Sequence, residues 1–303
     1  MPKRSFNGCD RQFDVMSPNI SHASSRVFAR LRDAFRDALF PLTCLMCGKF
    51  YLRRSGWENF NKRGVSFNET TRVPPSTALF ARRMAPYVCP ACSQQFTPIE
   101  SPCCTCCGVM FKSRQGTDHL CGGCLESKRY FGMARAVGVY DQALMAVIHG
   151  FKYGEKAGLA APLSLLLLNT YGHFWHDSPM DVVVPVPLHG RRLRKRGFNQ
   201  VYLAIRRWKD PTWQKSFPRP LEVQKSVLRR IRSTPPQTGM GRSERLQNVK
   251  GAFELAAFHT IRKKNILLVD DVYTTGATVN ECAKILLKGG ANAVDVLTLA
   301  RAM

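Results

Sequence analysis

Residues 266–279 of this 303-residue chain read Ile-Leu-Leu-Val-Asp-Asp-Val-Tyr-Thr-Thr-Gly-Ala-Thr-Val. The first four are apolar and partly β-branched, which predicts a buried strand of a parallel sheet. Asp270 and Asp271, the acidic pair, follow directly, and a turn of small residues comes next. The apolar pattern over 279–287 then predicts a helix. Strand, tight loop and helix in this order are typical of an α/β fold.

The loop between this strand and this helix is suited to bind a phosphate. N–H groups in the first turn of a helix have no intrahelical partner, and the helix dipole adds positive potential there. Thr274, Thr275 and Thr278 can add hydroxyl donors, and Gly276 lets the backbone approach closely. The acidic pair would repel a phosphate. Its carboxylates are instead suited to bind sugar hydroxyls or a hydrated Mg²⁺ next to the phosphate. The alternative is a plain strand–helix junction with Asp271 or Thr274 as a helix cap.

Residues 269–278 resemble the loop with which type I phosphoribosyltransferases bind phosphoribosyl pyrophosphate (PRPP). The resemblance implies that the acidic pair holds the 2′- and 3′-hydroxyls of the ribose, with Mg²⁺ bound alongside PRPP. It also implies that the small-residue turn holds the 5′-phosphate through Thr274, Thr275, Gly276, Ala277 and Thr278.

Charge and hydropathy limit the partners and the compartment. The net charge of +24 predicts polyanionic partners such as nucleic acid, phosphorylated metabolites or an anionic membrane face. A phosphate site needs only a few cations, so the surplus favours nucleic acid; a generally basic protein is the alternative. No apolar core follows Lys3 and Arg4, so no signal peptide is expected. No run of 18 apolar residues occurs, and the most apolar segment, 159–168, is too short to span a bilayer. These features predict a cytoplasmic protein without a transmembrane segment, whose thiols are reduced.

Three regions are predicted along the chain. Residues 1–40 are a basic lead followed by an amphipathic helix over 26–40, which docks on the protein body or rests on a membrane or partner. Residues 41–130 are rich in cysteine and contain a polar, basic insertion over 48–88, expected to be a mobile excursion. Residues 131–303 alternate strand and helix patterns and predict a parallel sheet flanked by helices.

The cysteines of the second region form four Cys-x-x-Cys pairs. Two such pairs complete a tetrahedral zinc site, so eight thiolates predict two structural zinc ions. Which pair joins which is open, and Cys103 with Cys106 can replace the third pair one residue out of register. Disulfides, a redox role and an iron–sulfur cluster are the alternatives. The proposed ligands are Cys44, Cys47, Cys89, Cys92, Cys104, Cys107, Cys121 and Cys124.

A basic run over 191–196 follows a predicted buried strand over 181–187. Five cations in six residues at the carboxyl end of a strand favour pyrophosphate or a nucleic acid backbone, with a solvated charge run as the alternative. Arg191 and Arg194 of this run, together with Lys152 earlier in the chain, are candidate ligands of the pyrophosphate of PRPP. The segment over 223–231 can be extended or helical.

The chain from about residue 40 resembles the ComF family of competence proteins, which includes ComFC- and GntX-like members. The motifs that carry the resemblance are the cysteine pairs, the loop at 269–278, segments 151–153, 184–188, 196–200 and 251–253, Gln237, and Arg245 with Asn248 and Val249. The family implies a type I phosphoribosyltransferase-like domain behind a double zinc ribbon, although the insertion over 48–88 departs from the usual compact ribbon.

The family also implies a function in natural transformation, in which incoming single-stranded DNA is handled with the membrane-associated DNA-uptake machinery. This function implies a protein on the cytoplasmic side of the membrane, either free in the cytoplasm or bound peripherally at the inner face of the membrane. Phe198, Tyr202 and Trp208 are candidate stacking faces for bases, or core residues. The alternative function is an active phosphoribosyltransferase that transfers ribose 5-phosphate from PRPP to an acceptor which the sequence does not identify.

Overall fold

The computed structural model describes residues 35, 39–52, 77–153, 156–215, 217, 219–234 and 241–303. The chain forms two compact units, Met1–Pro41 and Leu42–Met303. The sheet, its helices and all eight proposed zinc ligands lie in the second unit. The helix predicted over 26–40 lies outside the described residues except at 35, 39 and 40.

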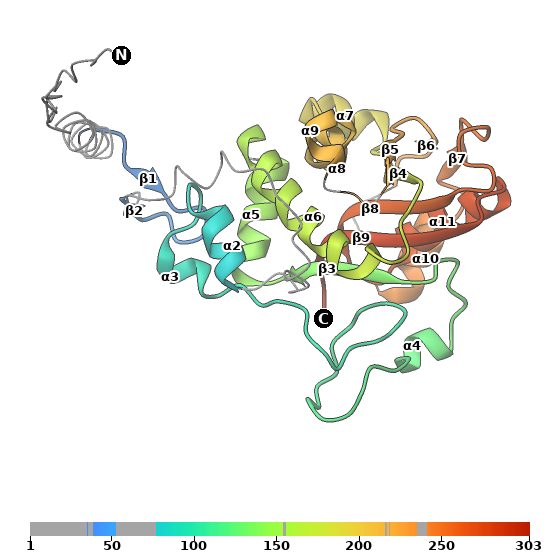
Figure 1. Cartoon of the computed structure of the whole chain (residues 1–303), viewed down its shortest axis with the longest axis horizontal. Coiled ribbons are helices and arrows are strands. Elements are labelled where there is room, and N and C mark those ends of the chain that lie inside the picture. Colours follow the sequence, from blue (N-terminus) through green and yellow to red (C-terminus); the bar gives the residue numbers. More distant parts are fainter. Residues whose placement is uncertain are drawn as a thin grey trace, which may run out of the picture. The chain divides into compact units, whose positions relative to one another are not determined.

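A parallel sheet of five strands forms the centre of the second unit, with strand order β3-β9-β8-β4-β5 (Figure 1). These strands are β3 (Ala134–Val139), β4 (Val182–Pro185), β5 (Glu222–Val223), β8 (Asn265–Tyr273) and β9 (Ala293–Arg301). The helices that connect them are α5 (Gln142–Tyr153), α6 (Ala160–Trp175), α7 (Gly190–Arg196), α8 (Gln200–Ile205), α9 (Pro211–Gln214), α10 (Arg242–Val249) and α11 (Ala277–Lys288). The predicted α/β fold with a parallel sheet flanked by helices is confirmed.

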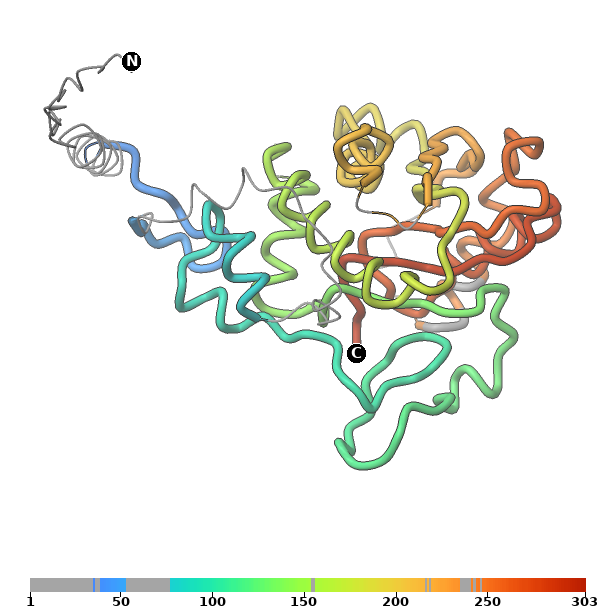
Figure 2. Tube along the Cα trace, viewed as in Figure 1, coloured from blue at the N-terminus to red at the C-terminus, as the bar shows by residue number. Residues whose placement is uncertain are grey.

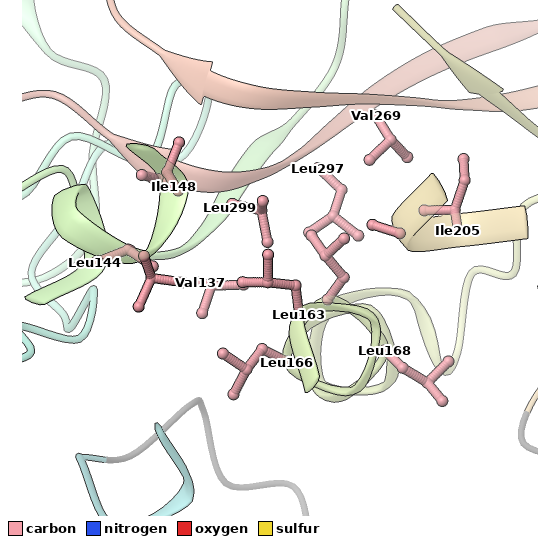
Figure 3. Close-up of a cluster of buried hydrophobic side chains, with 14 of the residues drawn as sticks. Val137, Leu144, Ile148, Leu163, Leu166, Leu168, Ile205, Val269, Leu297 and Leu299 are labelled. Carbon is pink, nitrogen blue, oxygen red and sulfur yellow. The ribbon is translucent and has the colours of Figure 1, made fainter. Parts of the chain in front are cut away.

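Apolar side chains alternate between the two faces of the sheet. In β8, Leu267 and Val269 join the core beneath α5, α6 and α8, whereas Ile266 and Leu268 join the core on the face of α11. Successive side chains of a strand point to opposite faces, and both faces of a parallel sheet are covered. Figure 3 shows the first of these cores, with side chains from α5, α6 and α8 meeting those of β3, β8 and β9. Four apolar residues in succession therefore serve two cores.

Three segments add to the predicted elements. The basic run, to which the sequence analysis assigned no helix or strand, forms a helix, α7. The undecided segment over 223–231 holds the end of β5 and the short strand β6 (Leu228–Arg230), which pairs antiparallel with β7 (Phe253–Leu255). The strand β8 continues through the acidic pair to Tyr273, because β9 pairs with it as far as Arg301.

The cysteine-rich region packs on the α/β body (Figure 2, blue to green). Its elements are β1 (Leu42–Thr43), β2 (Phe50–Tyr51), α2 (Thr77–Met84), α3 (Pro90–Ser93) and α4 (Gly122–Leu125). The prediction of a mobile excursion over 48–88 is wrong at both ends. Strand β2 pairs with β1, and Phe80 and Met84 of α2 are fully buried in the core that contains α5 and α6. Residues 53–76 lie outside the described residues.

Candidate functional site

The acidic pair lies near the carboxyl end of β8, where side chains from three elements meet. Lys152 in the last turn of α5 places its Nζ 2.9 Å from Oδ2 of Asp271. Gln200, the first residue of α8, donates from Nε2 to the same oxygen at 2.6 Å. The side chains of Asp271 and Lys152 are only 14% and 15% exposed, so their ion pair is largely shielded from water.

Gln200 is a site residue that the sequence predictions did not include. Asn199 caps α8, with its Oδ1 accepting the N–H groups of Val201 and Tyr202. This cap fixes the start of the helix and hence the direction of Gln200. Arg196 donates to Oε1 of Gln200 at 3.1 Å, so Gln200 links a cation of the basic run to Asp271. The signal in the sequence was the segment over 196–200, which the family resemblance used without assigning roles.

The two carboxyl groups have opposite pKa shifts. Burial, followed by the neighbouring charge of Asp271, raises the pKa of Asp270 to about 7. Burial also acts to raise the pKa of Asp271, but Lys152 and the hydrogen bonds from Lys152 and Gln200 outweigh it, so this pKa lies below its ordinary value. The pair therefore carries one firmly held negative charge and a second that appears near neutral pH. Ionised carboxylates accept hydrogen bonds from hydroxyls and coordinate Mg²⁺ through oxygen.

Asp270→Asn is expected to stabilise the protein at pH 8 by roughly 1 kcal/mol or more and to have little effect at pH 4. The folded pKa of Asp270 lies above its ordinary value near 3.8. The folded protein therefore holds a proton that the unfolded chain has released, and stability falls as the pH rises from about 4 to about 7. Asparagine stays neutral and removes this loss. Urea unfolding at both pH values measures the effect, and equal differences at pH 4 and pH 8 would contradict the assigned shift.

The small-residue loop joins β8 to α11. Gly276 immediately precedes the helix with φ +78° and ψ 6°, the left-handed conformation that glycine adopts without strain. Oγ1 of Thr275 accepts the N–H of Ala277 at 3.4 Å. Thr274 and Thr278 are partly exposed, while Gly276 and Ala277 are buried. The five residues named from the sequence thus run from the end of β8 into the first turn of α11, whose first residues are Ala277 and Thr278.

Gly276→Ala is expected to lower the free energy of unfolding by more than about 3 kcal/mol. A Cβ there would lie 2.2 Å from Oη and 2.4 Å from Cζ of Tyr273, whose ring is buried. The matched control is Gly197→Ala, because Gly197 has nearly the same φ, +77°, and no heavy atom within 4 Å of its added Cβ. The control bears only the left-handed strain, about 1–2 kcal/mol. Equal losses in both variants, measured by chemical denaturation, would remove the steric argument.

The predicted cations occupy different positions. Lys152 contacts the acidic pair directly, whereas Arg191 and Arg194 are exposed on α7. Two arginines absent from the predicted site meet at Thr234. Arg192 donates to the carbonyl of Thr234 at 3.0 Å, and Arg230 donates to Oγ1 of Thr234. The charge of Arg230 lowers the pKa of Asp270 against the larger effect of burial. The sequence signal for Arg230 was its place beside Arg229, which was not interpreted.

The eight proposed zinc ligands form two groups of four. Cys44, Cys47, Cys89 and Cys92 are the first cluster, and Cys104, Cys107, Cys121 and Cys124 are the second. Within each, the sulfur atoms lie within 4.8 Å of one another. The structure thus joins the first two pairs to each other and the last two to each other. Cys103 and Cys106 lie outside both groups, and the backbone N–H of Cys103 donates to Asp118.

The geometry of both clusters fits a tetrahedral metal. A zinc–sulfur bond of about 2.3 Å gives sulfur separations of about 3.8 Å. The Sγ atoms of Cys47 and Cys89 are 4.0 Å apart, and those of Cys107 and Cys121 are 3.7 Å apart. Burial raises thiol pKa values, but backbone N–H donors outweigh it and lower those of Cys44 and Cys104 to about 6. Each cluster can therefore hold one zinc ion.

The fold, the acidic pair and the two clusters together define an α/β protein with a parallel five-stranded sheet and two four-cysteine sites. The chain is 32% identical over 223 residues to DNA utilization protein YhgH of Escherichia coli K12, covering 71% of this chain and 91% of that protein. It is 30% identical to competence protein F of Haemophilus influenzae, over 71% and 90% of the two chains. The chain belongs to this family, the ComF family of competence proteins. Competence protein ComFC of Bacillus subtilis is 27% identical over 87% and 96%.

Other comparisons give less. No protein-family model matches the chain. Among solved structures it is similar to a purine phosphoribosyltransferase from Pyrococcus horikoshii, with 14% identity, a TM-score of 0.26 and coverage of 46% of this chain and 83% of that one. It is also similar to a hypoxanthine phosphoribosyltransferase from Staphylococcus aureus, with 14% identity, a TM-score of 0.25 and coverage of 48% and 62%. Similarity at this level says nothing about activity. In the described part of the chain, every helix is too short or too polar to cross a bilayer.

Proposed function

We propose that this protein binds PRPP with Mg²⁺ at the carboxyl end of β8 and handles incoming single-stranded DNA during natural transformation, on the cytoplasmic side of the membrane. The observation that carries the proposal is the acidic pair, which the contacts of Asp271 with Lys152 and Gln200 hold beside the loop over 274–278. In this arrangement the carboxylates receive the ribose hydroxyls and Mg²⁺, and the loop receives the 5′-phosphate. Lys152 and Arg196 supply positive charge beside Asp271 that can neutralise a pyrophosphate.

DNA handling is supported by the names of the relatives, competence protein F and DNA utilization protein, and by the charge of the chain. Of the three candidate stacking residues, Trp208 is fully buried and donates to Oγ of Ser164, and Phe198 packs against the same core. Tyr202 is half-buried, with Nζ of Lys225 5.5 Å from its ring centre. A more exposed aromatic beside the site is Tyr153, which is 66% exposed with the Arg196 guanidinium 4.9 Å from its ring centre. A base can stack on such an aromatic face beside a cation.

Catalysis is the second candidate function, and the cations around Asp271 favour it. Lys152 and Arg196 can stabilise the negative charge that develops on a departing pyrophosphate. An acceptor would then form a bond to the anomeric carbon of PRPP as the carbon–oxygen bond to pyrophosphate breaks. Positioning and charge stabilisation would supply most of the rate.

Two titrations test the proposal. Mg²⁺·PRPP should bind in a saturable 1:1 complex that EDTA abolishes; lack of binding by the zinc-loaded protein would overturn the PRPP assignment. A single-stranded oligonucleotide should bind with an affinity that falls steeply between 50 and 200 mM salt, as counterion release requires. Lack of salt-dependent binding would overturn the DNA assignment. Pyrophosphate release with one member of a panel of bases would favour the transferase.

A further inference from the structure

We propose that the second cluster holds the small-residue loop in place, through Arg301 and Arg129 as positioning residues. The effect of this link on PRPP binding rests on the proposed function. The coupling between the second cluster and the loop involves only residues of this chain. The cluster and the loop are far apart in sequence, yet both arginines contact both of them. Neither arginine touches the acidic pair.

Arg301 is the last residue of β9 and is 8% exposed. On the cluster side, its Nε donates to the carbonyl of Cys107 at 3.1 Å and its NH2 to Sγ of the same residue at 3.6 Å. On the loop side, its NH1 donates to the carbonyls of Tyr273 at 3.4 Å and Thr274 at 2.6 Å. Its guanidinium also lies 4.2 Å from the centre of the Tyr273 ring. One buried side chain thus joins a cluster cysteine to the start of the loop.

Arg129, five residues after Cys124 of the second cluster, also connects the cluster to the loop. It donates from NH2 to the carbonyl of Gly123, between the paired cysteines, and from NH1 to the carbonyl of Thr275, at 3.3 and 3.5 Å. Its neighbours attach to α11: the N–H of Tyr130 donates to Oδ1 of Asn280 at 2.8 Å, and the Asn280 amide donates to the carbonyl of Lys128 at 3.3 Å. The segment that leaves the cluster is therefore fastened to the first turn of the helix after the loop.

These contacts set the direction of the loop amides. In a trans peptide the carbonyl and the N–H point in opposite directions. Arg301 binds the carbonyl of the peptide between Thr274 and Thr275, and Arg129 binds that of the peptide between Thr275 and Gly276. The N–H groups of Thr275 and Gly276 consequently point away from the two guanidinium groups. Both arginines would be outer-sphere partners of a metal in this cluster, because four thiolates on one zinc would leave a net negative charge that attracts them.

Amide hydrogen exchange over 274–280 tests the coupling without any ligand, in the full-length zinc-loaded protein. The test variant is Cys121→Ser and the control is Cys89→Ser, because each cysteine immediately precedes a four-residue helix in its own cluster. Cys121→Ser should accelerate exchange in the loop at least about 10-fold, and Cys89→Ser less than about 2-fold. Equal acceleration in both variants, or none in either, would overturn the proposal.

Arg301→Lys serves where Cys121→Ser fails to fold. Lysine keeps the charge but cannot span Cys107 and Thr274 with separate donors. It should retain both zinc ions and still accelerate loop exchange about 10-fold; unchanged exchange would overturn the proposal.

A second arm uses Mg²⁺·PRPP as the probe. Coupling is reciprocal, so saturating PRPP should slow zinc release from the second cluster to a chelator about 10-fold, with the first cluster much less affected. PRPP that binds but leaves both release rates unchanged would count against the coupling. PRPP that does not bind would defeat the proposed function, while the ligand-free exchange result would stand.

Discussion

Asp270→Asn combined with Asp271→Asn abolishes binding of Mg²⁺·PRPP, with a loss of at least about 100-fold, while the chain remains folded. The double variant removes both negative charges and half of the carboxylate oxygens that would accept ribose hydroxyls or coordinate Mg²⁺. Charged hydrogen bonds each contribute about 1.5–3 kcal/mol, so losing two accounts for this factor. Isothermal titration at pH 8, where Asp270 is ionised, measures the loss.

The fold of that variant needs its own check, because Lys152 loses its partner. The Lys152 side chain is 15% exposed and its Nζ pairs with Asp271, so some stability is lost there. Neutralising Asp270 offsets part of this loss at pH 8. The control for net charge is Glu254→Gln, whose carboxylate pairs with Arg229 on the surface. Circular dichroism should show native structure in both variants, and PRPP affinity equal to that of the parent in the double variant would refute the site.

The second large effect concerns zinc. The reduced protein should contain about two zinc ions per chain, and Cys107→Ser should contain about one and unfold more than 10 °C lower. Apparent binding energies of structural zinc are about 10–16 kcal/mol in zinc-finger peptides, and a domain of this size loses about 2–4 °C per kcal/mol. Cys107 is buried, and its sulfur lies 3.7 Å from that of Cys121.

The neighbouring cysteine supplies the control. Cys106 is adjacent in sequence but lies outside the group of four, so Cys106→Ser should retain two zinc ions. Metal analysis by mass spectrometry, together with thermal melts, separates the two variants. Loss of zinc from Cys106→Ser with retention in Cys107→Ser would show that the alternative register, Cys103 with Cys106, supplies the ligands.

Local patterns in the sequence predicted the sheet, the acidic pair and the loop. Apolar runs identify strands because both faces of a parallel sheet are buried, and the residues of the loop are consecutive. The four Cys-x-x-Cys pairs likewise predicted two zinc sites. The basic run was interpreted by charge alone, and its helical spacing was overlooked. Arg196 bonds Gln200, and it is through Gln200 that the run connects to Asp271.

Contacts between distant segments could not be predicted in the same way. Arg301 meets the loop because β9 pairs with β8 in a register that sets Arg301 opposite Tyr273, 28 residues earlier. Nothing near Arg301 in the sequence indicates this register. Phe80 and Met84 were hidden in a polar insertion, where two buried side chains one helical turn apart make too weak a pattern to reveal α2. Neither the contacts of Arg301 nor the helix α2 could be predicted, because contacts between segments distant in sequence determine both.

The two clusters lie on opposite faces of the sheet, with Cys44 and Cys92 in one core and Cys104 and Cys107 in the other. A fragment that began at β3 would consequently expose apolar side chains on both faces of the sheet. Phe80, Met84 and Phe96 would be missing on one side. Anyone trimming the chain to its sheet and helices should therefore expect an insoluble product, and the cysteine-rich half belongs in every expressed version.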